Sequence, residues 1–177
     1  PFNIVCTSDG FVGKAGLMRA LGCIPTRKFQ PDTALVRDMH YAVKKLKSSI
    51  VLYPEASYSF DGTATPLPES IGKCVKALNV PVVMIRTYGA FARAPRDNGL
   101  QKRHAKVSAQ MQCLLSSSDV AERNVAEINE RIFSAFRFDN FRWQEENGVS
   151  VSEPFRADGL NRVLYKCPHC LTEGEME

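Results

Sequence analysis

Ile50-Val51-Leu52-Tyr53-Pro54-Glu55-Ala56-Ser57 is the stretch that decides the predicted fold class. Its first three residues form a short apolar run, which is typical of a buried strand. The remaining five open a loop rich in glycine, proline and serine. Open α/β sheets bind their ligands at the carboxyl ends of their strands. The stretch therefore predicts a buried strand whose end presents a carboxylate and a hydroxyl, from Glu55 and Ser57, to a ligand.

Strands and helices alternate on both sides of this stretch. Apolar periodicity predicts strands over 2–7, 50–53 and 81–86, a half-exposed strand over 104–115, and helices over 14–21, 32–47 and 69–78. A further amphipathic helix is predicted after Asp119, which has the spacing of a capping box with Glu122. This alternation predicts an α/β fold with a mostly parallel or mixed central sheet flanked by helices. We expect a single domain, with residues 1–146 forming its α/β part and 147–177 a C-terminal extension.

The composition and net charge of the chain indicate which kinds of binding partner to expect. The chain has 177 residues, of which 44% are hydrophobic, and a formal net charge of +4. This balance favours phosphates or an anionic membrane surface and is too small to indicate nucleic acid. No apolar run approaches the roughly 18 residues of a membrane-spanning helix. Four of the six cysteines lie singly in apolar segments, which favours reduced thiols and a cytoplasmic location.

Three blocks of sequence occur in an order that one enzyme family shares. They are Gly22-Cys23-Ile24-Pro25-Thr26-Arg27, Tyr53-Pro54-Glu55 and Val80-Pro81-Val82-Val83. In these blocks, residues 1 to about 115 resemble the glycerol-phosphate acyltransferase superfamily, particularly the 1-acyl-sn-glycerol-3-phosphate acyltransferases. The resemblance implies a glycerolipid acyltransferase-like fold. It also implies transfer of a fatty acyl group from acyl-CoA or acyl carrier protein to a lysophospholipid or glycerol-phosphate acceptor, in phospholipid synthesis.

The resemblance suggests roles for three residues. Arg27 follows a proline-fixed extended turn, and its planar guanidinium suits the phosphate of the acceptor. Glu55 matches a glutamate that the family associates with acceptor binding, and Ser57 is a secondary candidate to donate a hydrogen bond to phosphate. A surface ion pair for Arg27 and a loop-bracing role for Glu55 are the alternatives. The family's reaction needs no cofactor, and we expect residues 80–85 to form core and one wall of the acyl site.

Two positions near Glu55 depart from the family pattern. Ala56 stands where the family usually has glycine, so a positive φ here is expected to be strained. Tyr58 stands where many members have an arginine. The arginines that follow the last block, Arg86, Arg93 and Arg96, either replace that charge or are solvated loop cations.

The block that carries the family's catalytic base is absent from this sequence. In the family, the histidine of a His-x4-Asp block removes a proton from the acceptor hydroxyl. The histidines here are His40, His104 and His169, and the residues five positions later are Lys45, Ala109 and Gly174. We therefore expect the block to lie upstream of Pro1 and expect this chain to be inactive alone. The alternative is a non-catalytic lipid- or phosphate-binding module on the same scaffold.

Cys167-Pro168-His169-Cys170 is half of a zinc-binding signature. Two thiolates at this spacing can bind one tetrahedral ion, and a closed structural site needs four ligands. Cys167 and Cys170 are therefore candidate metal ligands in half a zinc knuckle, with structural zinc expected only if further ligands follow Glu177. A zinc-ribbon interaction protein is the corresponding alternative function.

Aromatic and basic residues are interleaved near residue 140. The cluster consists of Phe133, Phe136, Phe138, Phe141 and Trp143 with Arg131, Arg137 and Arg142. Such a mixture can dock on an anionic membrane surface. The amphipathic helix before it favours the alternative of aromatic core packing. The cluster is our candidate for peripheral contact with the inner face of a membrane.

Overall fold

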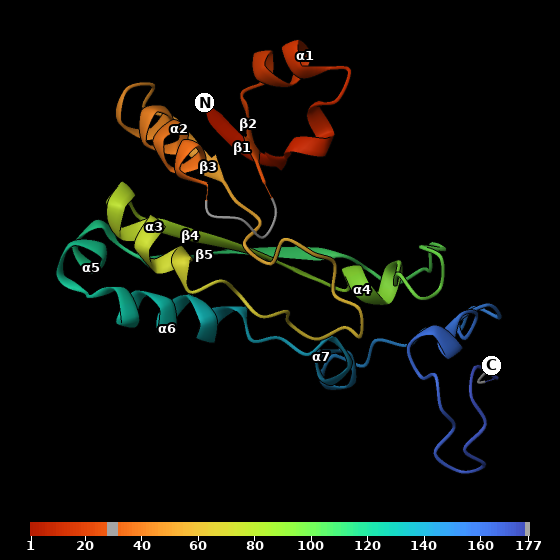
Figure 1. The fold of residues 1–177 in the computed structure, drawn as a ribbon. Coiled ribbons are helices and arrows are strands. Elements are labelled where there is room, and N and C mark those ends of the chain that lie inside the picture. The colour runs from red at the N-terminus through yellow and green to blue at the C-terminus, as the bar shows by residue number, and fades with distance from the viewer. Residues whose placement is uncertain (28–31, 176–177) are drawn as a thin grey trace. The chain divides into compact units, whose positions relative to one another are not determined.

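The computed structural model describes residues 1–27 and 32–175 (Figure 1). These residues form two compact units. Unit 1 comprises residues 1–56, 67–80 and 116–129, and unit 2 comprises residues 57–66, 81–115 and the chain from Glu130 onward. Each unit has its own small sheet, parallel in unit 1 and antiparallel in unit 2.

Unit 1 is built on a three-stranded parallel sheet with the strand order β2-β1-β3. The strands are β1 (Phe2–Thr7), β2 (Cys23–Thr26) and β3 (Ser49–Val51). Ile4 of the central strand lies opposite Cys23 on one side and Val51 on the other. Because parallel strands need crossover connections, the chain returns through η1 (Ser8–Phe11) and α1 (Ala15–Ala20) and then through α2 (Thr33–Lys44). The predicted strand over 2–7 is confirmed residue for residue.

The core of unit 1 gathers residues from the sheet, from α2 and from α3 (Ser70–Leu78). Its buried members are each at most 7% exposed: Val5, Ile24, Met39, Ala42 and Leu78. The two from α2 are spaced by three positions and therefore lie on one face of the helix, which packs in the core. Burial of these apolar side chains is the main stabilising contribution that the unit has.

α3 receives its N-terminal cap from another helix, α6 (Val125–Phe136). The Asn129 side-chain oxygen accepts a hydrogen bond from the Gly72 N–H at 2.7 Å, and its amide nitrogen donates to the Glu69 carbonyl at 2.8 Å. Glu69 occupies the N-cap position and makes no side-chain cap of its own. Asn129 therefore satisfies an N–H that the first turn of any helix leaves without a partner.

Lys76 on the same helix contacts the C-terminal end of α5 (Ser117–Glu122). Its ammonium donates to three carbonyls, those of Val120, Ala121 and Arg123, at 2.8, 2.8 and 2.6 Å. A helix leaves its last carbonyls without intrahelical partners, and a cation is favourable there. Lys76 thereby joins α3 to the segment that follows β5 in the sequence.

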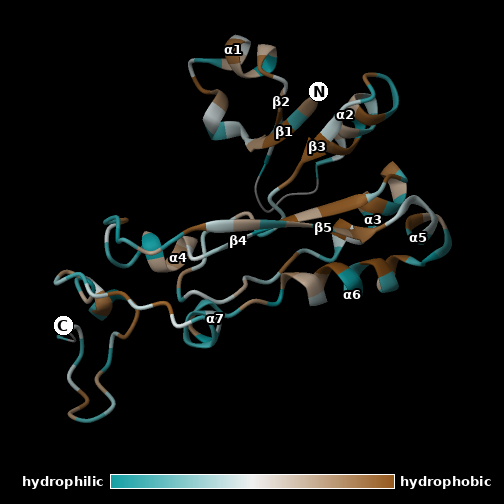
Figure 2. Ribbon diagram, turned by 180° about the vertical axis from the view of Figure 1, so that it is seen from behind, coloured by the Kyte–Doolittle hydropathy of each residue, from teal (hydrophilic) through white to brown (hydrophobic). Residues whose placement is uncertain are grey.

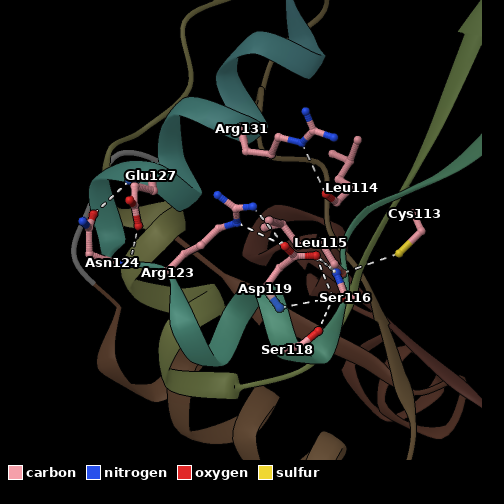
Figure 3. A network of polar contacts seen from close by, with 10 residues as sticks. All are labelled: Cys113, Leu114, Leu115, Ser116, Ser118, Asp119, Arg123, Asn124, Glu127 and Arg131. Carbon is pink, nitrogen blue, oxygen red and sulfur yellow. Dashed lines mark hydrogen bonds and ion pairs between the residues drawn. The ribbon is translucent and has the colours of Figure 1, made fainter.

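Two reciprocal caps set the register of α5 and α6 (Figure 3). The Ser116 hydroxyl accepts a hydrogen bond from the Asp119 N–H at 3.1 Å, and the Asp119 carboxylate accepts one from the Ser116 N–H at 2.9 Å. Asn124 and Glu127 exchange the same pair of bonds, at 3.0 and 2.8 Å. The predicted capping box of Asp119 with Glu122 is wrong, because Asp119 is the third helical residue of the box that begins at Ser116. A second cap at Asn124 divides the predicted helix into two.

Unit 2 contains a two-stranded antiparallel sheet of β4 (Val82–Tyr88) and β5 (Ser108–Leu115). The first half of β4 is strongly hydrophobic (Figure 2). The unit also contains α4 (Ala90–Arg93), α7 (Asn140–Glu146), η2 (Leu160–Arg162) and the second half of α6, from Glu130 onward. Met84 is buried, whereas Val83 and Ile85 are 52% and 61% exposed. The prediction that residues 80–85 are core therefore fails for Val83 and Ile85, because alternate residues of a strand face opposite sides.

The predicted half-exposed strand over 104–115 also differs from the observed one. β5 begins at Ser108, and within it only Leu114 and Leu115 are buried. Ala105 is buried, but it lies in the loop before the strand. Alternation indicates that two faces differ in polarity and does not indicate whether anything covers the apolar one.

The predicted α/β class is confirmed, and the arrangement of the sheets differs from the single central sheet that we expected. Pro54 follows β3 and Pro81 immediately precedes β4. Proline has no N–H to donate to a sheet ladder, which limits strand pairing at both points. The boundary at residues 146 and 147 stays a prediction. Within residues 1–27 and 32–175, every helix is too short or too polar to cross a lipid bilayer.

Alanine substitution at two helical glycines of unit 1 is expected to change the stability in opposite directions. A Cβ at Gly72 meets the Asn129 side-chain oxygen at 2.4 Å and the Val125 carbonyl at 2.8 Å, whereas a Cβ at Gly16 of α1 meets nothing within 4 Å. We expect Gly72→Ala to lower the free energy of unfolding by about 2 kcal/mol through overpacking. Gly16→Ala should raise it by about 1 kcal/mol, since alanine is the better helix former. Urea denaturation measures both, and equal effects of the two substitutions would contradict the packing described for Asn129.

Candidate functional site

The three parallel strands of unit 1 end at one edge of their sheet (Figure 1). β2 ends at Thr26 and is followed directly by Arg27, and β3 ends at Val51, shortly before Glu55. β1 lies between them and ends at Thr7. Because neighbouring strands lie about 4.8 Å apart, β2 and β3 are separated by about 10 Å across the sheet. In the common register β3 ends opposite Ile4 and β2 ends opposite Thr7, so the chain after β3 has about three more residues to run before it is level with Arg27.

Arg27 is exposed, and its backbone is held by the residue that caps α2. The Arg27 N–H donates to Asp32 Oδ2 at 3.4 Å, while Asp32 Oδ1 accepts a hydrogen bond from the Leu35 N–H at 3.0 Å. One carboxylate thus caps the helix and orients the residue after β2. Among residues 1–27 and 32–175, the guanidinium of Arg27 forms no ion pair, so the surface-pair alternative is not observed in that part of the chain.

A tight turn presents Glu55. The Ala56 N–H donates to the Tyr53 carbonyl at 3.2 Å, which closes a turn with Pro54 and Glu55 at its centre. Glu55 is half-buried. Ala56 has a φ of +53°, in the left-handed region that glycine occupies without strain. The backbone therefore has the conformation that a glycine favours, at the position where the resembled family usually has glycine.

Ser57 belongs to unit 2, whereas Arg27 and Glu55 belong to unit 1. It is the first residue of the stretch 57–66, and its role stays a prediction. The next residue, Tyr58, is 79% exposed, and the guanidinium of Arg96 lies 5.7 Å from the centroid of its ring. Of the three arginines considered as replacements for the missing charge, Arg96 is the one that the structure brings to Tyr58.

Sequence reasoning missed a histidine–carboxylate pair in unit 2. His104 Nδ1 lies 2.8 Å from Glu153 Oε1, and the same oxygen accepts a hydrogen bond from the His104 N–H. The hydrogen bond from this backbone N–H is the largest cause that lowers the pKa of Glu153 to about 2. The His104 ring is 98% exposed, so the pair serves chiefly to tie the C-terminal extension to the loop before β5. The two residues are 49 positions apart, and no sequence signal joins them.

Unit 2 also has an open groove of about 560 Å³, lined mainly by basic and aromatic side chains. We call it the basic–aromatic groove, and the members that matter here are Arg86, Tyr88, Arg137, Phe138, Arg142 and Trp143. The rings of Tyr88 and Trp143 stack with centroids 5.7 Å apart, and Phe138 meets Tyr88 edge-on at 5.7 Å. None of these three rings is fully buried. The cluster predicted from the sequence therefore forms a surface as well as internal ring contacts.

Charge in the groove is only partly neutralised. Arg142 pairs with Glu146 at 3.0 Å, and Asp139 accepts hydrogen bonds from the first N–H groups of α7. The guanidinium of Arg86 lies 5.7 Å from the centroid of the Phe138 ring. In the described chain, Arg86 and Arg137 form no ion pair. The groove thus offers two cations beside an aromatic platform, which suits an anionic group.

The β4–β5 sheet exposes an apolar face. Val83 lies opposite Cys113 and Ile85 opposite Met111, and directly opposite residues share one face of a sheet. Val83, Ile85 and Met111 are 52%, 61% and 69% exposed. This face is chemically suited to hydrocarbon, and the predicted role of residues 80–85 as one wall of an acyl site stays a prediction.

Cys167 and Cys170 lie on a short C-terminal hairpin and are not joined in a disulfide. A hydrogen bond from the Thr172 hydroxyl, 3.2 Å away, is the largest cause that lowers the pKa of Cys170 to about 7. Cys6 and Cys23 are also neighbours, on adjacent strands. The pKa of Cys6 shifts in the opposite direction, because burial raises it.

Comparison of the chain with protein-family models, with curated proteins and with solved structures gave no match. The resemblance to the acyltransferases therefore depends on the three sequence blocks.

Replacement of Ala56 by glycine tests the geometry of the turn. A left-handed alanine costs about 1–2 kcal/mol, and part of that gain is lost because glycine makes the unfolded chain more flexible. We expect Ala56→Gly to raise the free energy of unfolding by about 0.5–1 kcal/mol, measured in urea. The control is Ala77→Gly on the exposed side of α3, which should lower it by about 1 kcal/mol. A loss of stability at both positions would show that Ala56 does not adopt a positive φ in solution.

Proposed function

We propose that this chain is the greater part of an acyltransferase domain that transfers a fatty acyl group from acyl-CoA or acyl carrier protein to a lysophospholipid-type acceptor. The observation that carries the proposal is that Arg27 and the turn at Glu55 follow strands that end at the same edge of one parallel sheet. The two residues come from separate sequence blocks of the resembled family. The left-handed Ala56 adds support, because the turn keeps a backbone shape that favours the family's glycine.

In the proposed reaction, Arg27 binds the phosphate of the acceptor through paired, charge-assisted hydrogen bonds. Glu55 accepts a hydrogen bond from a glycerol hydroxyl and orients the acceptor. The hydroxyl oxygen attacks the thioester carbonyl, the new ester bond forms, and the carbon–sulfur bond breaks. The proton lost by the hydroxyl passes through a general base to the departing thiol. By resemblance, that base belongs to a His-x4-Asp block, and the step requires no metal.

Two surfaces of unit 2 suit the lipid side of this chemistry. The exposed apolar face of β4 and β5 is proposed to contact an acyl chain. The basic–aromatic groove is proposed to contact anionic phospholipid headgroups at a membrane surface, because Arg86 and Arg137 lie beside Trp143 and Tyr88. Arginine and tryptophan together are typical of peripheral proteins at a lipid–water interface.

A non-catalytic phosphate- or lipid-binding module on the same scaffold is the second candidate. The observation that favours it is that the chain has groups for binding and lacks the family's base. Arg27 and Glu55 follow strands of the parallel sheet, whereas no histidine of the chain has the spacing of the family's His-x4-Asp block. Of the three, His40 is exposed on α2, His104 bonds to Glu153, and His169 lies between the hairpin cysteines. Such a module binds the acceptor and transfers nothing.

Acyl transfer from acyl-CoA to lysophosphatidic acid tests the enzyme proposal. We expect the 177-residue chain to be inactive and a version with its native upstream sequence to be active, because the base is expected upstream. In the active version, Arg27→Ala should lower kcat/KM by about 100-fold, the value of about 3 kcal/mol of charged hydrogen bonding. Arg27→Lys should fall between the two, since lysine keeps the charge and loses the planar fork.

The matched control is Arg37→Ala on α2, whose exposed side chain pairs with Asp38 at 3.3 Å and which should leave kcat/KM unchanged. Activity of the short chain would contradict the missing base. If no version transfers acyl groups while Arg27→Ala still abolishes binding of lysophosphatidic acid, the binding module is the correct function.

Binding to vesicles tests the groove. The double variant Arg86→Ala, Arg137→Ala should bind vesicles of anionic phospholipid at least tenfold more weakly, since each basic residue near such a surface contributes about 1 kcal/mol. The control Lys102→Ala, Lys106→Ala removes the same charge from exposed positions outside the groove and should lose less. Co-sedimentation at two salt concentrations measures both. Equal losses in the two double variants would indicate non-specific attraction rather than a groove.

A further inference from the structure

The C-terminal hairpin, at the blue end of the chain in Figure 1, holds its two cysteines in a defined backbone. Lys166 and Glu173 form an isolated antiparallel bridge. The Cys167 N–H donates to the Thr172 carbonyl at 2.9 Å, and the Gly174 N–H donates to the Tyr165 carbonyl at 2.7 Å. These bonds close the hairpin below the four-residue segment that contains both thiols.

The segment itself is folded into a tight loop. The Leu171 N–H donates to the Cys167 carbonyl at 3.0 Å, so the chain reverses within the span of the two cysteines. Leu171 has a φ of +61°, in the left-handed region that a leucine rarely adopts. Non-glycine residues are held in this region where a surrounding structure requires it, and such positions gather at functional sites. The reversal is what brings Cys170 back toward Cys167.

Both cysteines belong to this closed turn, and Cys170 Sγ lies 3.2 Å from the Thr172 hydroxyl oxygen. A tetrahedral zinc ion with Zn–S bonds of about 2.3 Å separates two of its sulfur ligands by about 3.8 Å. Two cysteines three positions apart in one closed turn can place their sulfurs at that separation.

We propose that Cys167 and Cys170 form a two-thiolate site for a thiophilic divalent cation of the zinc class. This site is independent of the proposed acyl transfer. Within residues 1–27 and 32–175, no group of three or more histidine, cysteine or acidic side chains is suitably placed for a metal. The ion therefore takes its remaining ligands from outside these residues, for example from the same pair in a second copy of the chain or from solvent. Soft thiolate ligands exclude magnesium and calcium as occupants.

A second pair of cysteines in the chain provides an internal comparison. Cys6 and Cys23 lie on adjacent strands β1 and β2, and their thiols interact. They are partly buried in the regular backbone of a sheet, where no chain reversal brings two sulfurs toward one exposed point. Two neighbouring cysteines are common to both pairs, and only the hairpin pair lies in a closed turn.

Titration with Co²⁺ under reducing conditions tests the site, because cobalt bound to thiolate gives a charge-transfer absorption that unbound cobalt lacks. We expect the absorption to appear with the whole chain and to be displaced by Zn²⁺. Cys167→Ser and Cys170→Ser should each weaken binding by more than about 100-fold, since each removes a ligand, and loss of a mere supporting contact costs 10- to 100-fold. Cys6→Ser, Cys23→Ser and Cys113→Ser serve as controls and should leave the titration unchanged.

The stoichiometry identifies the remaining ligands. One ion per two chains, with dimer formation on addition of metal, means that a second copy completes the site, whereas one ion per chain means that solvent does. Both results support the proposal. Absence of the charge-transfer absorption in the reduced chain, or its persistence in Cys167→Ser and Cys170→Ser, overturns it. Circular dichroism of each variant confirms that the fold is intact, so that a loss of binding is not a loss of structure.

Discussion

The pairing of β1 with a parallel strand on each side is the constraint on which the candidate site depends. Parallel pairing sends the carboxyl ends of all three strands to one edge, so the residues that follow Thr7, Thr26 and Val51 leave the sheet at the same edge without any contact being specified between them. The core formed by Val5, Ile24 and Leu78 holds that pairing in place. Loss of the pairing separates Arg27 from Glu55, whatever the two side chains are.

Much of unit 1 could be predicted from the sequence because its signals are local. The strand at 2–7, the cap at Asp32 and the helix over residues 33–44 each follow from patterns within about a dozen residues. The division into two sheets could not be predicted, because periodicity identifies a strand and does not identify its partner. The same limit explains the exposed Val83 and Ile85, since an apolar strand face has the same pattern whether or not it is covered.

Only the part of the candidate site that comes directly after predicted strands could be located from the sequence. Arg27 follows β2 and Glu55 follows β3, and Ala56 has the positive φ that we expected to be strained if the backbone adopted it. The pair His104–Glu153 and the cap that Asn129 gives to α3 were not predictable, because each joins residues about 50 to 60 positions apart. The grouping of arginines with stacked rings was visible as composition, and its shape as a groove required the structure.

Lys76 has a consequence for the chemistry of the chain. All three of its protons are donated to carbonyls at the end of α5, so the amine has no lone pair to offer to an electrophile while these bonds persist. Its reaction with an acylating reagent requires that the ammonium first leave these carbonyls, so the reaction rate reports how often the three hydrogen bonds break. Lys73, exposed on the same helix, reacts without that step. The ratio of the two rates is therefore a measure of the free energy of the hydrogen bonds that join Lys76 to the end of α5.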